Sequence, residues 1–149
     1  MIDQTVPTPA RTLVDVADGT TVMIGGFGMI RRGHGGVCVL GAFQMTAHGD
    51  LANEHTGAPD AIPAVGGTMD LAVGARQTWV MMEHCTKTGE PRIVEHCTCP
   101  LTGLACVSRI YTDLAVIDVT PAGLRVVERC QGLSMQALQA VTAAGLRFG

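Results

Sequence analysis

The sequence contains few aromatic and few charged residues. Of its 149 residues, 3% are aromatic and 15% are charged, whereas 47% are hydrophobic. This is not the composition of a disordered protein, which combines low hydrophobicity with high net charge. We therefore expect one folded domain over residues 1–149, with a core of Val, Leu, Ile, Ala and Met rather than aromatic side chains.

The sequence also lacks a concentration of basic charge. Its formal net charge is −3 at pH 7, and only Arg31 and Arg32 are adjacent basic residues. Nucleic-acid-binding proteins carry a strongly basic surface, so we expect no nucleic-acid partner.

Targeting and membrane segments are missing too. No apolar run approaches the roughly 18 to 20 residues that a membrane-spanning helix needs. The start, MIDQTVPTPART, lacks the basic and then apolar regions of a secretory signal. We expect no membrane contact, a cytoplasmic location and six reduced cysteines, of which Cys38 and Cys106 lie in apolar surroundings and are expected to be buried.

Short apolar stretches predict strands over residues 20–24, 37–40 and 78–82. The third stretch, TWVMM, is almost continuously apolar, as in strands of a parallel α/β sheet that is covered on both faces. Accordingly, Met81 and Met82 are expected in the core.

Two further elements are predicted near the end of the chain. Pro121 and Gly123 occupy the second and fourth positions of a turn, so residues 113–119 and 124–128 are expected to form a β-hairpin. Ser134 is expected to cap a final helix through about Ala143, with Leu133 and Leu138 forming a hydrophobic staple.

Gly66 and Gly67 precede a predicted helix over residues 68–75. Free N–H groups at a helix start can hold an anion, so these glycines are candidate binding residues. A tight turn that needs glycine is the other interpretation.

Histidine and cysteine pairs raise the alternative of a zinc site. The candidate ligands are His84, Cys85, His96, Cys97 and Cys99. The spacing argues against it, because no Cys-x2-Cys pair occurs and residues 97 and 99 would point in opposite directions on a strand. We expect no metal. His34 and His48 are interpreted as turn residues, the latter beside Gly49, which supplies an unusual backbone angle.

Three blocks after residue 36 carry a family resemblance. They read VCVLGAFQMTAHGDLAN, GAPDAIPAVGGTMDLAVGA and CPLTGLACVSRIYTDLAVIDVTPAGL. Together they resemble the C-terminal part of the B subunit of 3-oxoacid CoA-transferases, in the branch that acts on 3-oxoadipate, and the match continues to about Leu146. The resemblance implies an α/β fold, an open mixed sheet flanked by helices, as in a truncated CoA-transferase subunit.

The same resemblance implies an activity. Family members move CoA from succinyl-CoA to a 3-oxoacid, with the CoA thioester as substrate and no bound cofactor, and they assemble from A and B subunits into hetero-oligomers. Their nucleophile is a glutamate that forms a glutamyl-CoA intermediate. The loop matching Gly66 and Gly67 lies beside that glutamate, where backbone N–H groups would stabilise an oxyanion.

The nucleophile motif of the family, Ser-Glu-Asn-Gly, does not occur here. None of the five glutamates has that context, so no catalytic residue is assigned among Glu54, Glu83, Glu90, Glu95 and Glu128.

The start of the chain also departs from the B-type pattern. DGTTVMIGGFG, over residues 18–28, resembles the opening of the family's A subunit, whereas FGMIRRGH from Phe27 onward resembles the B subunit. We predict an A-like start over residues 1–26 and a B-like portion over 27–149. Two functions stay open: an enzyme subunit that a partner completes, or a catalytically inactive remnant that acts at most in assembly or binding.

Overall fold

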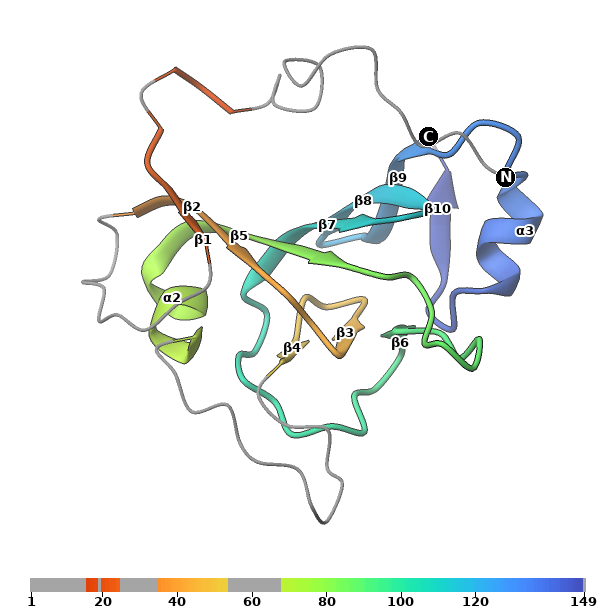
Figure 1. Cartoon of the computed structure of the whole chain (residues 1–149), viewed down its shortest axis with the longest axis horizontal. Helices are drawn as coiled ribbons and strands as arrows, with labels where there is room; N and C mark the ends of the chain where they lie inside the picture. Colours follow the sequence, from red (N-terminus) through yellow and green to blue (C-terminus); the bar gives the residue numbers. More distant parts are fainter. Residues whose placement is uncertain (1–15, 19, 25–34, 54–67, 149) are drawn as a thin grey trace.

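The computed structural model describes residues 16–18, 20–24, 35–53 and 68–148, and its main element is a seven-stranded sheet (Figure 1). The strand order is β1-β2-β5-β7-β8-β9-β10. The strands are β1 (Val22–Ile24), β2 (Gly35–Leu40), β5 (Ala75–Met82), β7 (Val107–Thr112), β8 (Ala115–Thr120), β9 (Gly123–Arg129) and β10 (Leu146–Phe148).

The sheet is mixed, as the resemblance implied. Strands β1, β2, β5 and β7 pair in parallel. Strands β7, β8 and β9 pair antiparallel, and β10 returns parallel to β9. The three strands predicted from apolar stretches overlap β1, β2 and β5, so the α/β prediction is confirmed.

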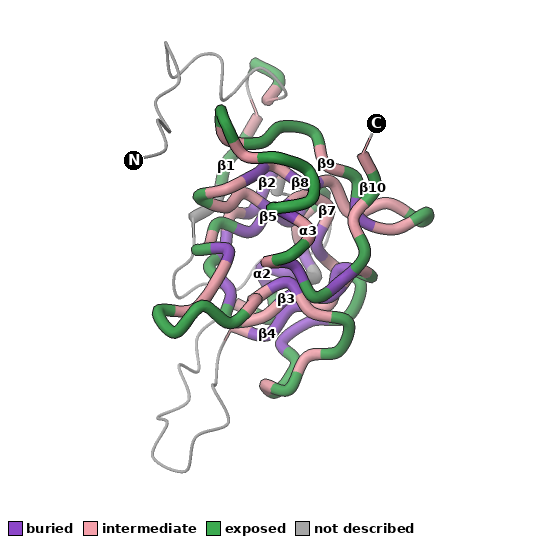
Figure 2. Tube along the Cα trace, turned by 90° about the vertical axis from the view of Figure 1, so that its right-hand side faces the viewer, coloured by how far each residue is buried: buried purple, intermediate pink, exposed green. Residues whose placement is uncertain are grey.

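One face of this sheet is covered by the remaining elements. These are α2 (Thr68–Gly74), α3 (Met135–Ala140) and a small sheet of β3 (Gln44–Thr46), β4 (Leu51–Ala52) and β6 (Ile93–Val94). In Figure 2 buried backbone concentrates between the large sheet and β3 and β4. The shared core contains aliphatic side chains from both layers: Leu40, Met45, Leu51, Leu71, Val80, Ile93, Ile110, Ile117, Leu124 and Leu138.

The prediction that β5 is covered on both faces is confirmed for the middle of the strand and fails at its end. The neighbours Trp79 and Val80 point to opposite faces and both are buried. Val80 is fully buried, whereas its neighbour Met81 is 60% exposed. Successive side chains of a strand point to opposite faces, and the described helices and small strands lie on only one of them. Met82 packs against the core as expected, but Met81 does not.

The two predicted terminal elements are present. β8 and β9 form the hairpin, with Thr120 paired to Gly123, whose φ is +107°. Ser134 caps α3, since its Oγ accepts a hydrogen bond from the Ala137 N–H at 3.0 Å. The helix ends at Ala140 rather than near Ala143, because the Ala143 N–H donates to the Ile93 carbonyl at 3.0 Å and draws the chain toward β6.

Ala105 has a φ of +45°, the only non-glycine residue with positive φ in the part of the chain that the structure describes. Its N–H donates to Asp50 Oδ1 at 2.9 Å, which holds the turn. An L-residue in this region costs roughly 1 to 2 kcal/mol. We expect Ala105→Gly to raise the free energy of unfolding by about 0.5 kcal/mol in urea titrations, after the greater freedom of glycine in the unfolded chain is subtracted.

Ala122 provides the matched control for this substitution. It lies exposed in the β8–β9 hairpin, and its φ is not positive. Glycine there gains no relief of strain, so Ala122→Gly should lower stability slightly. If both variants were destabilised equally, backbone strain at residue 105 would be ruled out.

Candidate functional site

A pocket opens at the carboxyl ends of β2 and β5. β2 ends at Leu40 and β5 ends at Met82, and the lining residues lie at or directly beyond these strand ends or on neighbouring loops. Ligands of open α/β sheets bind at this edge. The pocket has a volume of about 380 Å³ and is lined by Gly41, Ala42, Phe43, Asn53, Met81, Met82 and Arg92.

Backbone hydrogen bonds hold the pocket walls together. The Phe43 N–H donates to the Ala52 carbonyl at 2.8 Å, and the Met45 N–H donates to the Arg92 carbonyl at 2.9 Å. Three segments that are distant in sequence are therefore fixed side by side through β3, β4 and β6. The side chain of Gln44 extends this support, because its Oε1 accepts hydrogen bonds from the N–H groups of Thr98 and Cys99 at 2.7 and 3.0 Å.

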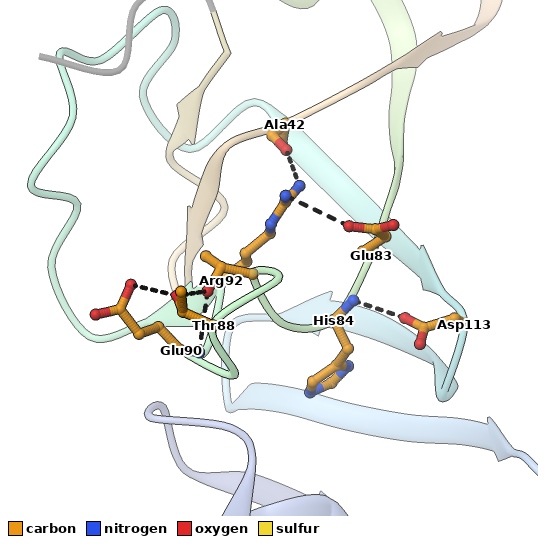
Figure 3. A network of polar contacts seen from close by, with 8 residues as sticks. Ala42, Glu83, His84, Thr88, Glu90, Arg92 and Asp113 are labelled. Carbon is orange, nitrogen blue, oxygen red and sulfur yellow. Dashed lines mark hydrogen bonds and ion pairs between the residues drawn. The ribbon is translucent and has the colours of Figure 1, made fainter. Parts of the chain in front are cut away.

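Arg92 is the cationic residue of the pocket lining. Figure 3 shows its guanidinium between the Ala42 carbonyl, 3.5 Å away, and the Glu83 carboxylate, 3.6 Å away. The Glu83 side chain is 64% exposed, so this ion pair contributes little to stability. A guanidinium has five N–H donors, which leaves Arg92 able to contact an anionic ligand as well.

Asn53 supplies an unsatisfied acceptor. Its Oδ1 is buried and has no hydrogen-bond partner among the described residues, whereas its backbone N–H donates to Thr102 Oγ1 at 3.2 Å. Buried polar atoms without partners are rare in native proteins. An acceptor of this kind beside a pocket is suited to a hydroxyl or amide donor on a ligand.

His84 lies next to the site but is not part of its lining. Its Nδ1 is 3.0 Å from Thr112 Oγ1 and its Nε2 is 2.8 Å from Thr142 Oγ1. Burial lowers the pKa of His84, and the charge of Asp113 opposes this shift. The neutral imidazole therefore joins the ends of β5 and β7 to the segment after α3, which is a structural role.

The zinc interpretation finds no support in the geometry. Within residues 16–18, 20–24, 35–53 and 68–148 no three His, Cys, Asp or Glu side chains could hold a metal ion. Residues 97 and 99 lie in a loop after β6, so the argument from strand alternation was wrong about their setting. Burial, with smaller effects of Asp50 and Cys99, raises the pKa of Cys97 to about 11, so its thiol stays protonated at neutral pH.

The other sequence-based predictions divide into two groups. Several fall on residues outside the described part of the chain: Gly66, Gly67, Glu54, His34 and the stretch 25–34. Among the described residues, Cys38 is fully buried and Cys106 is partly buried, and Gly49 has a φ of +85° beside the exposed His48. Glu90, Glu95 and Glu128 are exposed and do not line the pocket.

Sequence reasoning did not single out Phe43, Asn53 or Arg92. Phe43 lies in the short link between β2 and β3, and Asn53 directly follows β4. Their position at strand ends, within LGAFQ and LAN, is the sequence signal that could have identified them. Arg92 is about fifty residues away in the chain, and only the pairing of β3 with β6 brings it to the pocket.

Comparisons with known proteins place this chain in a family. The sequence profile of the coenzyme A transferase family matches residues 29–134. An acyl-CoA transferase apoenzyme from Escherichia coli has a similar fold, with a TM-score of 0.64 at 14% identity over 76% of this chain and 26% of that one. The chain belongs to the coenzyme A transferase family.

Within the family, the chain is similar to B subunits. It is 62% identical over 120 residues to the B subunit of 3-oxoadipate CoA-transferase from Acinetobacter baylyi, a match that covers 80% of this chain and 55% of that relative. A mitochondrial succinyl-CoA:3-ketoacid coenzyme A transferase of Rattus norvegicus is 44% identical over 124 residues, covering 81% of this chain and 24% of the relative. The chain thus spans about half the length of the B subunits that it resembles.

Among the described residues, no helix is long and apolar enough to cross a bilayer.

Proposed function

We propose that this chain is a B-type CoA-transferase subunit that takes part in moving CoA from succinyl-CoA to a 3-oxoacid, first of all 3-oxoadipate. The observation that carries the proposal is the pocket at the carboxyl edge of the parallel strands, whose lining residues all lie within the range 29–134 that matches the family. Its volume of about 380 Å³ suits the acyl end of a thioester rather than a whole CoA molecule.

In this proposal the described residues bind and orient the substrate. Arg92 faces the carboxylate of the 3-oxoacid, and Phe43 with Met81 forms an apolar wall that limits water. Asn53 Oδ1 accepts a hydrogen bond from an amide N–H of the pantetheine arm of CoA, because the acyl group itself has no donor. The N–H groups of Gly66 and Gly67 are proposed, from the resemblance, to stabilise the oxyanion of thioester attack. The CoA thioester is a substrate here, and no resident cofactor takes part.

The chemical step requires a nucleophilic carboxylate. In the family mechanism that carboxylate attacks the acyl-CoA carbonyl and forms an acyl anhydride with loss of the CoA thiolate. The thiolate then attacks the glutamyl carbonyl of the anhydride, which releases the acyl group as its carboxylate and leaves a glutamyl-CoA thioester. The Ser-Glu-Asn-Gly context is absent from this chain. We therefore propose that turnover needs partners, an A-type subunit and further copies in a hetero-oligomer, and that the missing carboxylate is supplied within that assembly.

A second candidate rests on the same absence. A chain with an A-like start over residues 1–26 and a B-like portion over 27–149, without the nucleophile segment, can fold and assemble without turning over substrate. In this alternative it is a catalytically inactive remnant with at most a binding or assembly role.

An activity assay separates the two candidates. The purified chain, alone and mixed with the A-type partner of a 3-oxoadipate CoA-transferase, is incubated with succinyl-CoA and 3-oxoadipate, and 3-oxoadipyl-CoA is measured together with the intact protein mass. Turnover in the mixture supports the enzyme subunit. No turnover and no CoA adduct, with a folded sample, support the inactive remnant. An adduct that Glu83→Gln removes would identify a nucleophile that we do not expect.

Asn53→Leu tests the pocket independently of turnover. Removing a buried acceptor without a partner is expected to raise the free energy of unfolding by about 1 kcal/mol, because its desolvation cost disappears. The same change should weaken the binding of succinyl-CoA about tenfold in calorimetric titrations, since one ligand hydrogen bond is lost. Gln44→Leu, which breaks a satisfied network, should instead lower stability. Unchanged succinyl-CoA affinity in Asn53→Leu would remove Asn53 from the site.

A further inference from the structure

Arg92 is firmly held at its backbone but only loosely contacted at its guanidinium. Its N–H donates to the His84 carbonyl at 3.0 Å, and its carbonyl accepts from the Met45 N–H at 2.9 Å. The guanidinium lies 3.5 Å from the Ala42 carbonyl and 3.6 Å from the Glu83 carboxylate (Figure 3). Both contacts are longer than the roughly 2.8 Å of a charge-assisted hydrogen bond. The side chain is therefore positioned, while its donors remain able to form shorter bonds.

A second ion pair of the chain has the geometry of a structural pair. Arg109 and Arg125 approach the Asp118 carboxylate at 2.6 and 2.8 Å, and the Asp118 side chain is 13% exposed. In the pair of Arg92 with Glu83 the distance is 3.6 Å and the acid is 64% exposed. Glu83 does not line the pocket, so it lies beside the pocket rather than in it. An exposed and loose pair of this kind opens easily, since it contributes little to stability.

The pocket offers an entering carboxylate one cationic partner among its described residues. Of the residues that line it, Arg92 alone carries a charge. The planar fork of a guanidinium matches a carboxylate with two parallel hydrogen bonds. Phe43 and Met81 form the apolar wall beside it. A carboxylate at the end of an acyl chain would therefore be drawn to the guanidinium, while the methylene groups of that chain contact the wall.

The substrates of the proposed function share a group that takes no part in the reaction. Succinyl-CoA and 3-oxoadipate each have one carboxyl group that carries or receives CoA, and a second that stays a free carboxylate throughout. Binding energy from a non-reacting part of a substrate can be used to position the reacting part. A cationic side chain that binds the second carboxylate would orient both acyl groups in the same way.

We propose that Arg92 selects acyl groups that bear a second, non-reacting carboxylate, and that Glu83 is an internal competitor which this carboxylate displaces. The inference rests on the proposed function, because it assigns a role within the same pocket. Without a ligand, Glu83 neutralises the guanidinium. When the acyl group enters, its carboxylate takes the place of Glu83, whose side chain turns to solvent. Arg92 thus determines specificity, and Glu83 limits affinity.

Two thioesters that differ only in this carboxylate test the proposal. Succinyl-CoA ends in a carboxylate, whereas butyryl-CoA ends in a methyl group on an acyl chain of the same length. Calorimetric titration of the purified full chain with each ester gives two dissociation constants, and neither measurement needs turnover. We expect the wild-type chain to bind succinyl-CoA about tenfold more tightly than butyryl-CoA, the contribution of a hydrogen bond to a charged group that is partly exposed.

Substitutions of the two residues should act in opposite directions. Arg92→Met removes the charge and should abolish the preference by weakening only succinyl-CoA, whereas Arg92→Lys, which keeps the charge without the fork, should retain part of it. Glu83→Gln should tighten succinyl-CoA about threefold and leave butyryl-CoA unchanged, since an exposed ion pair competes weakly. A gain in affinity cannot come from a variant that fails to fold. Unchanged succinyl-CoA affinity in Glu83→Gln would rule out the competitor role.

Arg76→Met is the matched control, because Arg76 is exposed at the start of β5, at the opposite end of the strand from the pocket. It removes the same charge and should leave the preference unchanged. Equal losses of succinyl-CoA affinity from Arg92→Met and Arg76→Met would show that the net charge of the chain, rather than Arg92, causes the preference.

The outcomes separate this inference from the proposed function. Equal affinity of the wild-type chain for the two esters, or a preference that Arg92→Met leaves intact, overturns the inference alone. Selective binding without turnover in the activity assay supports the inference and counts only against transferase activity. If neither ester binds to a folded sample, the proposed function and the inference fail together.

Discussion

Replacing His84 by alanine is expected to lower the free energy of unfolding by about 3 kcal/mol, because a buried ring and its hydrogen bonds are lost together. The ring is fully buried and lies between Thr112 Oγ1 at 3.0 Å and Thr142 Oγ1 at 2.8 Å. These hydroxyls belong to β7 and to the segment after α3, so the substitution removes a connection between these two parts of the structure.

The two hydroxyls beside the ring are themselves held by the backbone. The Thr142 hydroxyl donates to the Leu138 carbonyl at 2.8 Å, and the Thr112 hydroxyl donates to the Ala115 carbonyl at 3.1 Å. His84→Gln keeps a polar group in this place and should lose less stability than His84→Ala. Urea titrations of the two variants, with His96→Ala as the exposed control, measure the difference.

The same residue gives the protein a pH dependence. Burial lowers the pKa of His84 in the folded state below the value of about 6.5 that an unfolded chain has. Between these two pKa values the unfolded state binds more protons, so stability falls as the pH falls through 6.5 and stops falling below the folded-state pKa. We expect His84→Gln to flatten this part of the stability curve. An unchanged slope between pH 7 and 5 would show that another group causes it.

Leu138→Ala is expected to cost about 3 kcal/mol of unfolding free energy, since it removes a fully buried side chain and leaves a cavity. Leu138 is the buried residue of α3 and packs in the same core as Met45, Ile93 and Ile117. The loss should weaken the docking of α3 on the sheet. Circular dichroism and urea midpoints give the measurement.

Met135→Ala provides the control on the same helix. Met135 begins α3 and is 47% exposed, so its truncation should change stability by less than about 0.5 kcal/mol. A similar loss from both substitutions would mean that α3 is held by its helical propensity rather than by the contact of Leu138 with the core.

Local signals in the sequence were sufficient for several elements. Pro121 and Gly123 identified the β8–β9 hairpin, and Ser134 identified the start of α3, because turn and capping preferences depend on residues a few positions apart. The apolar stretches located β1, β2 and β5 for the same reason. The end of α3 was misplaced, since the hydrogen bond from Ala143 to Ile93 joins residues that are fifty positions apart.

The pocket required information that no local pattern contains. Gly41, Ala42 and Phe43 follow β2 in a motif that the family resemblance marked, but Arg92 reaches the same pocket only through the pairing of β3 with β6. The apolar residues around Met81 in the sequence likewise did not predict that its side chain is 60% exposed. A continuous apolar strand predicts two buried faces, which is confirmed at Trp79 and Val80 but not at Met81.

The sequence by itself determined the family, the α/β class and the absence of the Ser-Glu-Asn-Gly motif, because these depend on residue identities in order along the chain. The tertiary structure decided which side chains share a pocket, that His84 is a buried structural residue, and that Trp79 is buried beside Arg109 and Tyr111. Those properties depend on strand register and on which layers pack together, and both are set by contacts between distant residues.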